Sequence, residues 1–192
     1  EASEVFVDGT FFSCPSLFYQ MLTISVVKER CSFNVAYFLR PGKSRDVYVQ
    51  AFEHCRAALT DLNLSVSFDL VRTDFELALI QAILFVFPGA RHRGCHFHFS
   101  QAIWRKVQEL GLSKAYRLDT SVAGFVRKMI SLAFVPPNFQ WNQHQNRGAR
   151  TNNLKEAWHR KINNMVGKAH PNLFAFVDLL KKDEATSRVS LL

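Results

Sequence analysis

The chain has 192 residues, which is enough for one hydrophobic core or two small ones. Hydrophobic residues make up 48% and charged residues 21%, a balance that is typical of a folded domain and excludes a disordered tail. Phenylalanine supplies 18 residues, against 3 Trp and 4 Tyr, and this usage favours strands over a simple helical bundle. The net charge of +8 makes a polyanionic partner the first expectation.

The excess positive charge lies in the second half of the chain. Residues 1–99 hold 9 Lys and Arg against 10 Asp and Glu, whereas residues 100–192 hold 15 against 6. Between Asp119 and Asp178 the only acidic residue is Glu156, and it stands among many lysines and arginines. The basic half therefore surrounds one isolated glutamate.

The sequence predicts neither a membrane-spanning segment nor a disulfide framework. The longest apolar run, residues 77–87, contains Gln81 and is too short to span a membrane. No signal segment opens the chain, which starts at Glu1, so we expect a fragment of a longer protein. The four cysteines show no CxxC pair, which fits a reducing compartment: Cys14, Cys31, Cys55 and Cys95.

The first part of the chain predicts three strands and then a helix. Residues 4–7, 16–24 and 32–39 are rich in β-branched and aromatic residues and are joined by short connections, which indicates an antiparallel meander. Residues 44–59 change to helical spacing, and Ser44 is a suitable N-cap.

The middle of the chain alternates strand and helix. We expect a strand over 65–71, a helix over 75–87, a strand over 91–99, and a helix over 100–110 that stops at Gly111. The order βββαβαβ predicts an α/β architecture with a mixed five-stranded sheet covered by helices.

The last part of the chain is predicted to be helical. A helix over 120–132 is expected to end before Pro136 and Pro137, and the polar residues 138–150 read as a loop. Helices are expected over 151–166 and from Pro171 to about Lys182.

Two acidic residues follow predicted strands. Asp8 follows the first strand and Asp74 follows the fourth, and open α/β sheets place their ligands at the carboxyl ends of strands. If the two strands are neighbours, the carboxylates meet. In the alternative interpretation, Asp8 and Gly9 only form a turn and Asp74 only caps the next helix.

Glu156 is the third candidate acid. The helix from Thr151 has an apolar stripe that leaves Glu156 on the opposite, polar face with His159, Arg160 and others. A carboxylate there could complete a metal site against the sheet. The alternative is a capping box between Asn153 and Glu156, and both roles can coexist.

Three converging carboxylates suit phosphodiester chemistry. Two divalent cations can activate an attacking water or hydroxyl and stabilise the leaving oxygen, and Mg²⁺ prefers carboxylate oxygens. The surrounding lysines and arginines would then hold a nucleic-acid backbone.

Cys95, His96 and His98 form a compact cluster. On a strand Cys95 and His98 would point to opposite faces, so binding of one ion by both would require a turn. Because zinc normally takes four ligands, the spacing favours a buried thiol with a structural histidine over a metal site.

Four motifs in this order resemble the transposase core of Mutator-like elements (MULEs). They are DGTF at residues 8–11, TDFELA at 73–78, RGCHFHFSQ at 93–101 followed by WRK at 104–106, and RTNNLKEAWH at 150–159. The resemblance spans nearly the whole chain.

The resemblance implies an RNase H-like catalytic domain with a DDE triad. The triad and metal-binding roles, for two Mg²⁺ or Mn²⁺ ions, fall on Asp8, Asp74 and Glu156, and the family's CxxH element falls on Cys95 and His98. The basic residues expected to contact DNA are Arg105, Lys106, Arg147, Arg150, Lys155, Arg160 and Lys161.

The same resemblance divides the chain into three parts. Residues 1–110 are the expected sheet core with two acids, 111–150 a shortened helical insertion and linker, and 151–192 the helices with the third acid. The implied activity is metal-dependent DNA cleavage and strand transfer, with DNA as partner, no membrane, possible self-association and a nuclear location.

The sequence also departs from the family pattern. The helical insertion before the last catalytic helix is shortened, and the upstream DNA-recognition zinc domain is absent from this chain. The alternative function is therefore a catalytically inactive, host-adopted module that binds DNA or protein, and a weaker third is a stand-alone RNase H-like nuclease.

Overall fold

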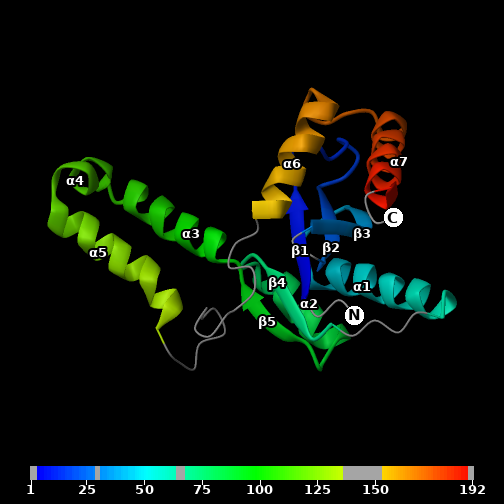
Figure 1. Cartoon of the computed structure of the whole chain (residues 1–192), viewed down its shortest axis with the longest axis horizontal. Helices are drawn as coiled ribbons and strands as arrows, with labels where there is room; N and C mark the ends of the chain where they lie inside the picture. Colours follow the sequence, from blue (N-terminus) through cyan, green and yellow to red (C-terminus); the bar gives the residue numbers. More distant parts are fainter. Residues whose placement is uncertain (1–3, 29–30, 64–67, 136–152, 190–192) are drawn as a thin grey trace.

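The computed structural model describes residues 4–28, 31–63, 68–135 and 153–189, and its centre is a five-stranded mixed sheet (Figure 1). The strands are β1 (Glu4–Thr10), β2 (Gln20–Lys28), β3 (Cys31–Arg40), β4 (Leu70–Thr73) and β5 (Arg91–Gly94). Their order in space is β3-β2-β1-β4-β5. β2 is antiparallel to both β1 and β3, whereas β4 is parallel to both β1 and β5. The predicted meander and mixed sheet are confirmed.

Seven α-helices and one short 3-10 helix belong to the described residues. They are α1 (Arg45–Asp61), α2 (Leu77–Val86), α3 (His96–Glu109), α4 (Ser113–Leu118), α5 (Thr120–Ser131), η1 (Leu132–Phe134), α6 (Asn153–Val166) and α7 (Leu173–Val189). In the part of the chain that the structure describes, no helix is both long and apolar enough to cross a membrane.

Helices cover the two faces of the sheet, each over its own apolar cluster. The larger cluster joins β1, β2 and β4 to α1 and α2 and includes Val7, Phe52 and Ile83. The smaller one joins β2 and β3 to α6 and α7 and includes Met21 and Ile162. Side chains alternate between the faces along each strand. Val7 faces α1 and α2, so its neighbour Asp8 faces the α6 side.

Local sequence signals account for several helix ends. The Ser44 side chain accepts a hydrogen bond from the Val47 amide at the start of α1, which confirms the predicted N-cap. Gly111 follows α3 with φ of +71°, a conformation that glycine adopts without steric cost. The predicted stop at Gly111 is therefore also correct.

Several predicted boundaries were wrong. β2 spans Gln20–Lys28 and not residues 16–24. β4 starts at Leu70, later than the expected residue 65, and residues 65–67 lie outside the described part of the chain. β5 ends at Gly94 and α3 already begins at His96, within the stretch expected to be a strand. The last helix, α7, continues to Val189, past the expected end near Lys182.

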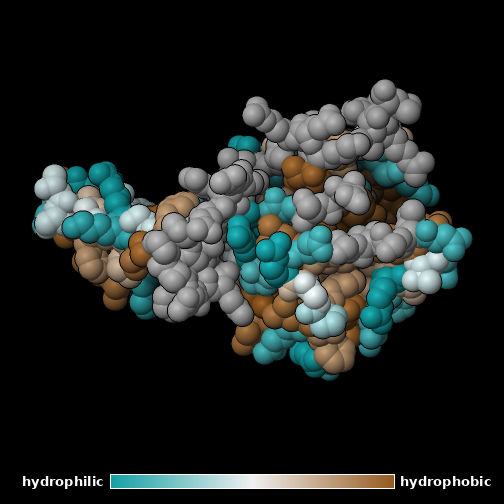
Figure 2. Space-filling model, turned by 60° about the horizontal axis from the view of Figure 1, so that its bottom comes forward, coloured by the Kyte–Doolittle hydropathy of each residue, from teal (hydrophilic) through white to brown (hydrophobic). Residues whose placement is uncertain are grey.

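Helices α3, α4 and α5 form an arm that projects from the β5 side of the sheet (Figure 1). The sequence missed α4, a six-residue helix without a side-chain cap. Apolar side chains reach the surface of this arm (Figure 2), with Leu118 75% and Phe125 65% exposed. The expected loop over 138–150 and the two prolines before it lie outside the described residues. The three-part division at residues 110 and 150 stays a prediction.

Candidate active site

Asp8 and Asp74 occupy matching positions on neighbouring parallel strands. The β1–β4 ladder pairs Val5 with Val71 and Phe6 with Arg72. Continued by two residues in the same register, it brings Asp8 opposite Asp74. β1 itself runs on through Asp8 to Thr10 against β2, so Asp8 lies within the strand and not in a turn after it. The two strands are thus neighbours, as the prediction for these acids required.

Asp8 is a buried carboxyl group in a charged environment. It is 7% exposed, and burial is the main cause that raises its pKa to about 6. The charges of His98 and Lys155 oppose this rise, and the negative charge of Asp74 adds to it. Because Asp74 acts on Asp8 as a like charge, the two carboxylates share one electrostatic site.

Asp74 also organises the start of α2. Its Oδ1 accepts a hydrogen bond from the Glu76 amide at 3.2 Å, next to the first residue of the helix. The preceding Thr73 shares a 2.8 Å hydrogen bond with Nε2 of His92 on β5. The N-cap residue of α2 is Glu76, so the interpretation of Asp74 as the cap of this helix is wrong. Its side chain bonds the backbone just before the helix, which does not conflict with a role beside Asp8.

Helix α6 places a polar stripe along the end of β1. Nδ1 of His159 lies 3.9 Å from Oδ2 of Asp8, and the Asn163 side chain accepts a hydrogen bond from Ser13. Glu156 precedes His159 by three residues and so belongs to the same stripe. The predicted polar face of this helix is therefore turned toward the candidate site.

His159 was not singled out by the sequence and is half-buried beside Asp8. Burial lowers its pKa to about 4, and the charges of Lys155 and His98 act in the same direction. The imidazole is neutral at pH 7, so its contact with Asp8 is not an ion pair. Its position three residues after Glu156 on one helix was the signal that could have found it.

Lys155 contradicts the prediction of a DNA contact. It is 1% exposed, and its Nζ donates hydrogen bonds to Ser25 Oγ on β2 and to Asn34 Oδ1 on β3, the latter at 2.6 Å. Nζ also lies 4.9 Å from the centre of the Trp158 ring. The side chain points into the sheet face because those strands offer it oxygen acceptors, and it fixes α6 there.

Glu156 is the third candidate carboxylate and lies on α6, one turn before His159. It is half-buried, and its Oε1 finds no hydrogen-bond partner among the described residues. Within residues 4–28, 31–63, 68–135 and 153–189, however, no three His, Cys, Asp or Glu side chains lie together closely enough to hold a metal ion. The chemistry of these side chains, carboxylate oxygens of which one is buried without a partner, is the kind that a hard divalent cation prefers.

Cys95 and His98 lie at the start of α3 and not on a strand. Cys95 is the N-cap residue and is buried, and a hydrogen bond from His98 to Cys95 is the main cause that raises the pKa of His98. The charges of Asp8 and Asp74 also raise it. The helical turn thus brings this pair together and directs His98 toward the two acids.

The remaining predicted DNA contacts are distributed over two helices. Arg105 and Lys106 are exposed on α3, and Lys106 pairs with Glu109 at 2.8 Å. Arg160 is exposed on α6, and Lys161 bonds to the buried Asp183 at 2.6 Å. Arg147 and Arg150 lie outside the described residues.

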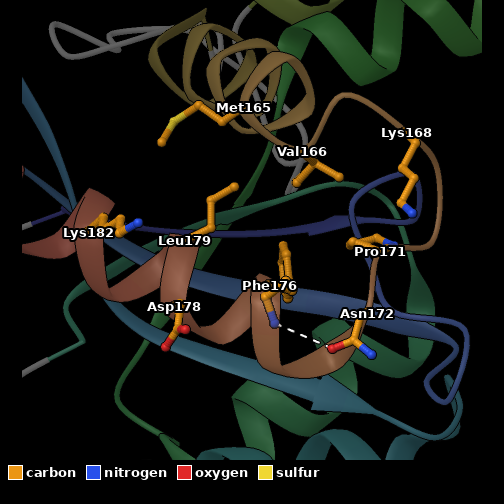
Figure 3. A pocket seen from close by; sticks show the side chains of 10 residues that line it. Met165, Val166, Lys168, Pro171, Asn172, Phe176, Asp178, Leu179 and Lys182 are labelled. Carbon is orange, nitrogen blue, oxygen red and sulfur yellow. Dashed lines mark hydrogen bonds between the residues drawn. The ribbon is translucent and has the colours of Figure 1, made fainter.

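A pocket of about 610 Å³ lies between α6 and α7 (Figure 3). Met165, Phe176 and Leu179 supply apolar lining, and Lys168 and Lys182 stand at its border. None of its lining residues is one of the three candidate acids. The candidate site is therefore at the end of β1 and β4, and this pocket is separate from it.

Comparison with known proteins gives one family. The family described as MULE transposase domain matches residues 4–102. No curated protein matches the chain. Among solved structures, a chain in a cryo-EM structure of the simian T-cell lymphotropic virus intasome in complex with PP2A regulatory subunit B56 gamma is similar at 11% identity and a TM-score of 0.35. The match covers 77% of this chain and 55% of that one, so this chain spans little more than half of its length.

Proposed function

The chain belongs to the MULE transposase domain family, and on that premise we propose that it is the catalytic domain of a DNA transposase. The proposed reaction begins with hydrolysis of a phosphodiester bond at a DNA element's end. The freed 3′-hydroxyl then attacks a phosphodiester of target DNA, and strand joining releases the leaving 3′-oxygen. Both steps are metal-dependent in this proposal.

The observation that carries the proposal is the pairing of Asp8 with Asp74. Each acid lies two residues beyond the last pair of the parallel β1–β4 ladder, Asp8 within β1 and Asp74 directly after β4, and the charge of Asp74 raises the pKa of Asp8. A buried carboxylate beside a second, half-buried one is unfavourable without a cation or proton to compensate the charge. Such an arrangement is typical of a site that binds a cation.

Asp8, Asp74 and Glu156 are the residues that would hold Mg²⁺ or Mn²⁺. Two such ions, when bound, polarise the phosphodiester and stabilise the attacking and leaving oxygens. The chain's own part is to present three carboxylates from two strands and one helix, with α6 fixed through Lys155. The Cys95–His98 pair is assigned to organising the acid pair or contacting DNA, because the charge of His98 stabilises ionised Asp8.

The transposase proposal also includes a fold type, a partner and a cellular location. The strand order β3-β2-β1-β4-β5, antiparallel on one side of β1 and parallel on the other, supports an RNase H-like assignment. DNA is the proposed partner, held by exposed Arg105, Lys106 and Arg160. Self-association and a nuclear location are proposed with it.

The decisive experiment is a plasmid-nicking assay with the purified chain. Supercoiled DNA is incubated with Mn²⁺ or Mg²⁺, and nicking and joining of a labelled oligonucleotide are measured for the wild type and for Asp74→Asn. We expect metal-dependent nicking that the variant loses by about 100-fold or more. The matched control is Asp61→Asn at the exposed end of α1, which should keep the wild-type rate. Nicking that survives Asp74→Asn, or that needs no metal, would refute the proposal.

A second candidate function is a non-catalytic DNA-binding module. The observation that favours it is that no three metal-binding side chains lie together in the described part of the chain. In that case DNA binding would persist in EDTA, fall steeply with salt, and be accompanied by no nicking at any metal concentration. The same plasmid assay, run beside a binding titration, separates the two functions.

A further inference from the structure

The loop between β1 and β2, residues 11–19, begins three residues after Asp8 and is held from several sides. We call it the aromatic loop. The Ser13 side chain bonds to Asn163 on α6, and the amide of His170 donates to the Phe12 carbonyl at 3.1 Å. Nδ1 of His170 lies 3.0 Å from the Cys14 carbonyl. The loop backbone is thus fixed against α6 and the turn that follows it.

The rigid loop nevertheless displays large aromatic side chains. Ser13 and Cys14 are fully buried, whereas Phe11 is 51% exposed and Tyr19 is 45% exposed. The Phe11 and Tyr19 rings meet edge to face, with centres 5.6 Å apart at 86°. This geometry leaves ring surface open to a ligand at a fixed place just past the end of β1, the strand that carries Asp8. Exposed aromatic surface on an ordered loop is typical of a binding site.

Positive charge accompanies these rings. Nζ of Lys43 lies 6.0 Å from the centre of the Tyr19 ring. The turn that holds the loop carries exposed Lys168, and exposed Arg160 lies on α6, which also bonds the loop. Aromatic faces interleaved with cations are the features that bind single-stranded nucleic acid, because every base has a stacking face and every phosphate a negative charge.

We propose that Phe11 and Tyr19 form a stacking platform for unpaired nucleobases of the DNA strand that enters the acid site. The inference rests on the proposed function for its choice of DNA. The fixed backbone keeps the entropic cost of binding low, since the rings are already positioned. Phe11 follows Asp8 by three residues, about 10 Å of extended chain, so a DNA strand held on the rings would also reach Asp8.

The test is a binding titration of a fluorescent single-stranded oligonucleotide in EDTA, which is independent of catalysis. We expect the double variant Phe11→Ala/Tyr19→Ala to raise the Kd for the single strand by about tenfold or more, since base stacking contributes about 1–3 kcal/mol per base. The aromatic replacement Phe11→Trp/Tyr19→Phe should keep the wild-type Kd. The matched control is Leu17→Ala, a 74% exposed apolar residue of the same loop, which should change the Kd less than twofold.

Three results would overturn the platform. The first is an equal Kd for single-stranded DNA in the wild type and the double variant. The second is an equal loss of affinity for single-stranded and for fully paired DNA. The third is a wild type that does not bind single-stranded DNA. The last would leave an apolar protein partner as the loop's occupant. Failure of the proposed function looks different, because a wild type that never nicks DNA but loses single-strand binding on Phe11→Ala/Tyr19→Ala would still confirm the platform.

Discussion

Asp8 on β1 and Asp74 after β4 are register partners, each two residues beyond the last pair of the parallel ladder, Phe6 with Arg72. β1 holds Asp8 inside the sheet, and Asp74 directly follows Thr73, the last residue of β4, so the parallel pairing of the two strands brings the acids near each other. Asp8 faces α6, which adds Lys155 and His159 to its surroundings. The electrostatic consequences of this pairing can be measured without any substrate.

The stability of the metal-free protein should reveal the burial of Asp8. Its folded pKa of about 6 lies above the ordinary value of 3.8, so its contribution to stability is present below pH 3.8 and is lost as pH rises through 6. Asp8→Asn, which mimics the neutral form, should therefore raise the free energy of unfolding above pH 6 by on the order of 2–3 kcal/mol. The gain should shrink toward zero near pH 4.

Urea denaturation in EDTA at several values between pH 4 and 8 provides the measurement. The exposed Asp61→Asn serves as the control and should change stability by under about 0.5 kcal/mol. A gain for Asp8→Asn that is the same at pH 4 and pH 8 would contradict the assignment.

His92 should show the opposite dependence on pH. Burial lowers its pKa from 6.5 to about 4, so its neutral form is favoured in the folded state. The stability it supports is present above pH 6.5 and is lost as pH falls toward 4, because the unfolded chain then binds a proton that the folded chain does not. His92→Gln should reduce this loss by about 1–3 kcal/mol. Urea denaturation at several pH values checks this. If the free energy of unfolding changes with pH between 4 and 6.5 as much in His92→Gln as in the wild type, the ring is solvated.

Gly94 leaves room for the ring of Phe75. A Cβ at Gly94 would lie 2.2 Å from Phe75 Cζ, so Gly94→Ala must push the ring away from β5. Because Phe75 is the neighbour of Asp74, we expect the variant to lower the nicking rate by about tenfold while it costs about 1–2 kcal/mol of stability. Gly89→Ala, with nothing within 4 Å, is the matched control. Equal rates for both alanine variants would show that Phe75 does not influence the acid.

Lys155 and Lys161 lie on one helix and should behave differently. Lys155→Ala removes a buried side chain and two hydrogen bonds, and should cost about 2–4 kcal/mol. Lys161 is about half exposed in its pair with Asp183, so Lys161→Ala should cost under about 1 kcal/mol. Urea denaturation of both variants checks the difference.

The salt dependence of DNA binding provides the second measurement on the same pair. Lys155→Ala should leave the slope of log K against log salt unchanged, because a buried ammonium contacts no phosphate. Arg160→Ala should reduce that slope by about one. A reduced slope for Lys155→Ala would mean that α6 lifts from the sheet when DNA binds.

The sequence predicted the order of strands and helices because its patterns are local. The β-branched meander and the Ser44 cap each act over a few residues, and both were correct. The segment from His96 to Phe99 misled the prediction because its polar and aromatic residues alternate as in a strand, while Cys95 actually starts a helix there. α4 gave no signal because Leu112 at its start offers no capping side chain.

The candidate site was predictable in its acids and not in its bases. Asp74 directly follows a predicted strand, and Asp8 was expected after the first strand but lies within it. The burial of Lys155 depends on Ser25 and Asn34, two polar residues that β2 and β3 bring under α6. Helix periodicity predicts only the apolar stripe of α6. It does not show which hydrogen-bond acceptors on other strands will face the helix. For the same reason the sequence placed His159 only on the polar face of its helix.

The arm of α3, α4 and α5 branches from the sheet after β5, when both aspartates have already been placed by the ladder. Changes of length at its tip therefore leave the spacing of Asp8 and Asp74 untouched. The corner between α4 and α5 at Asp119 is exposed, with its carboxylate bonded to the Ser121 amide. This corner is a natural insertion point for a reporter or an added binding module, so the domain can be given new cargo without redesign of its centre.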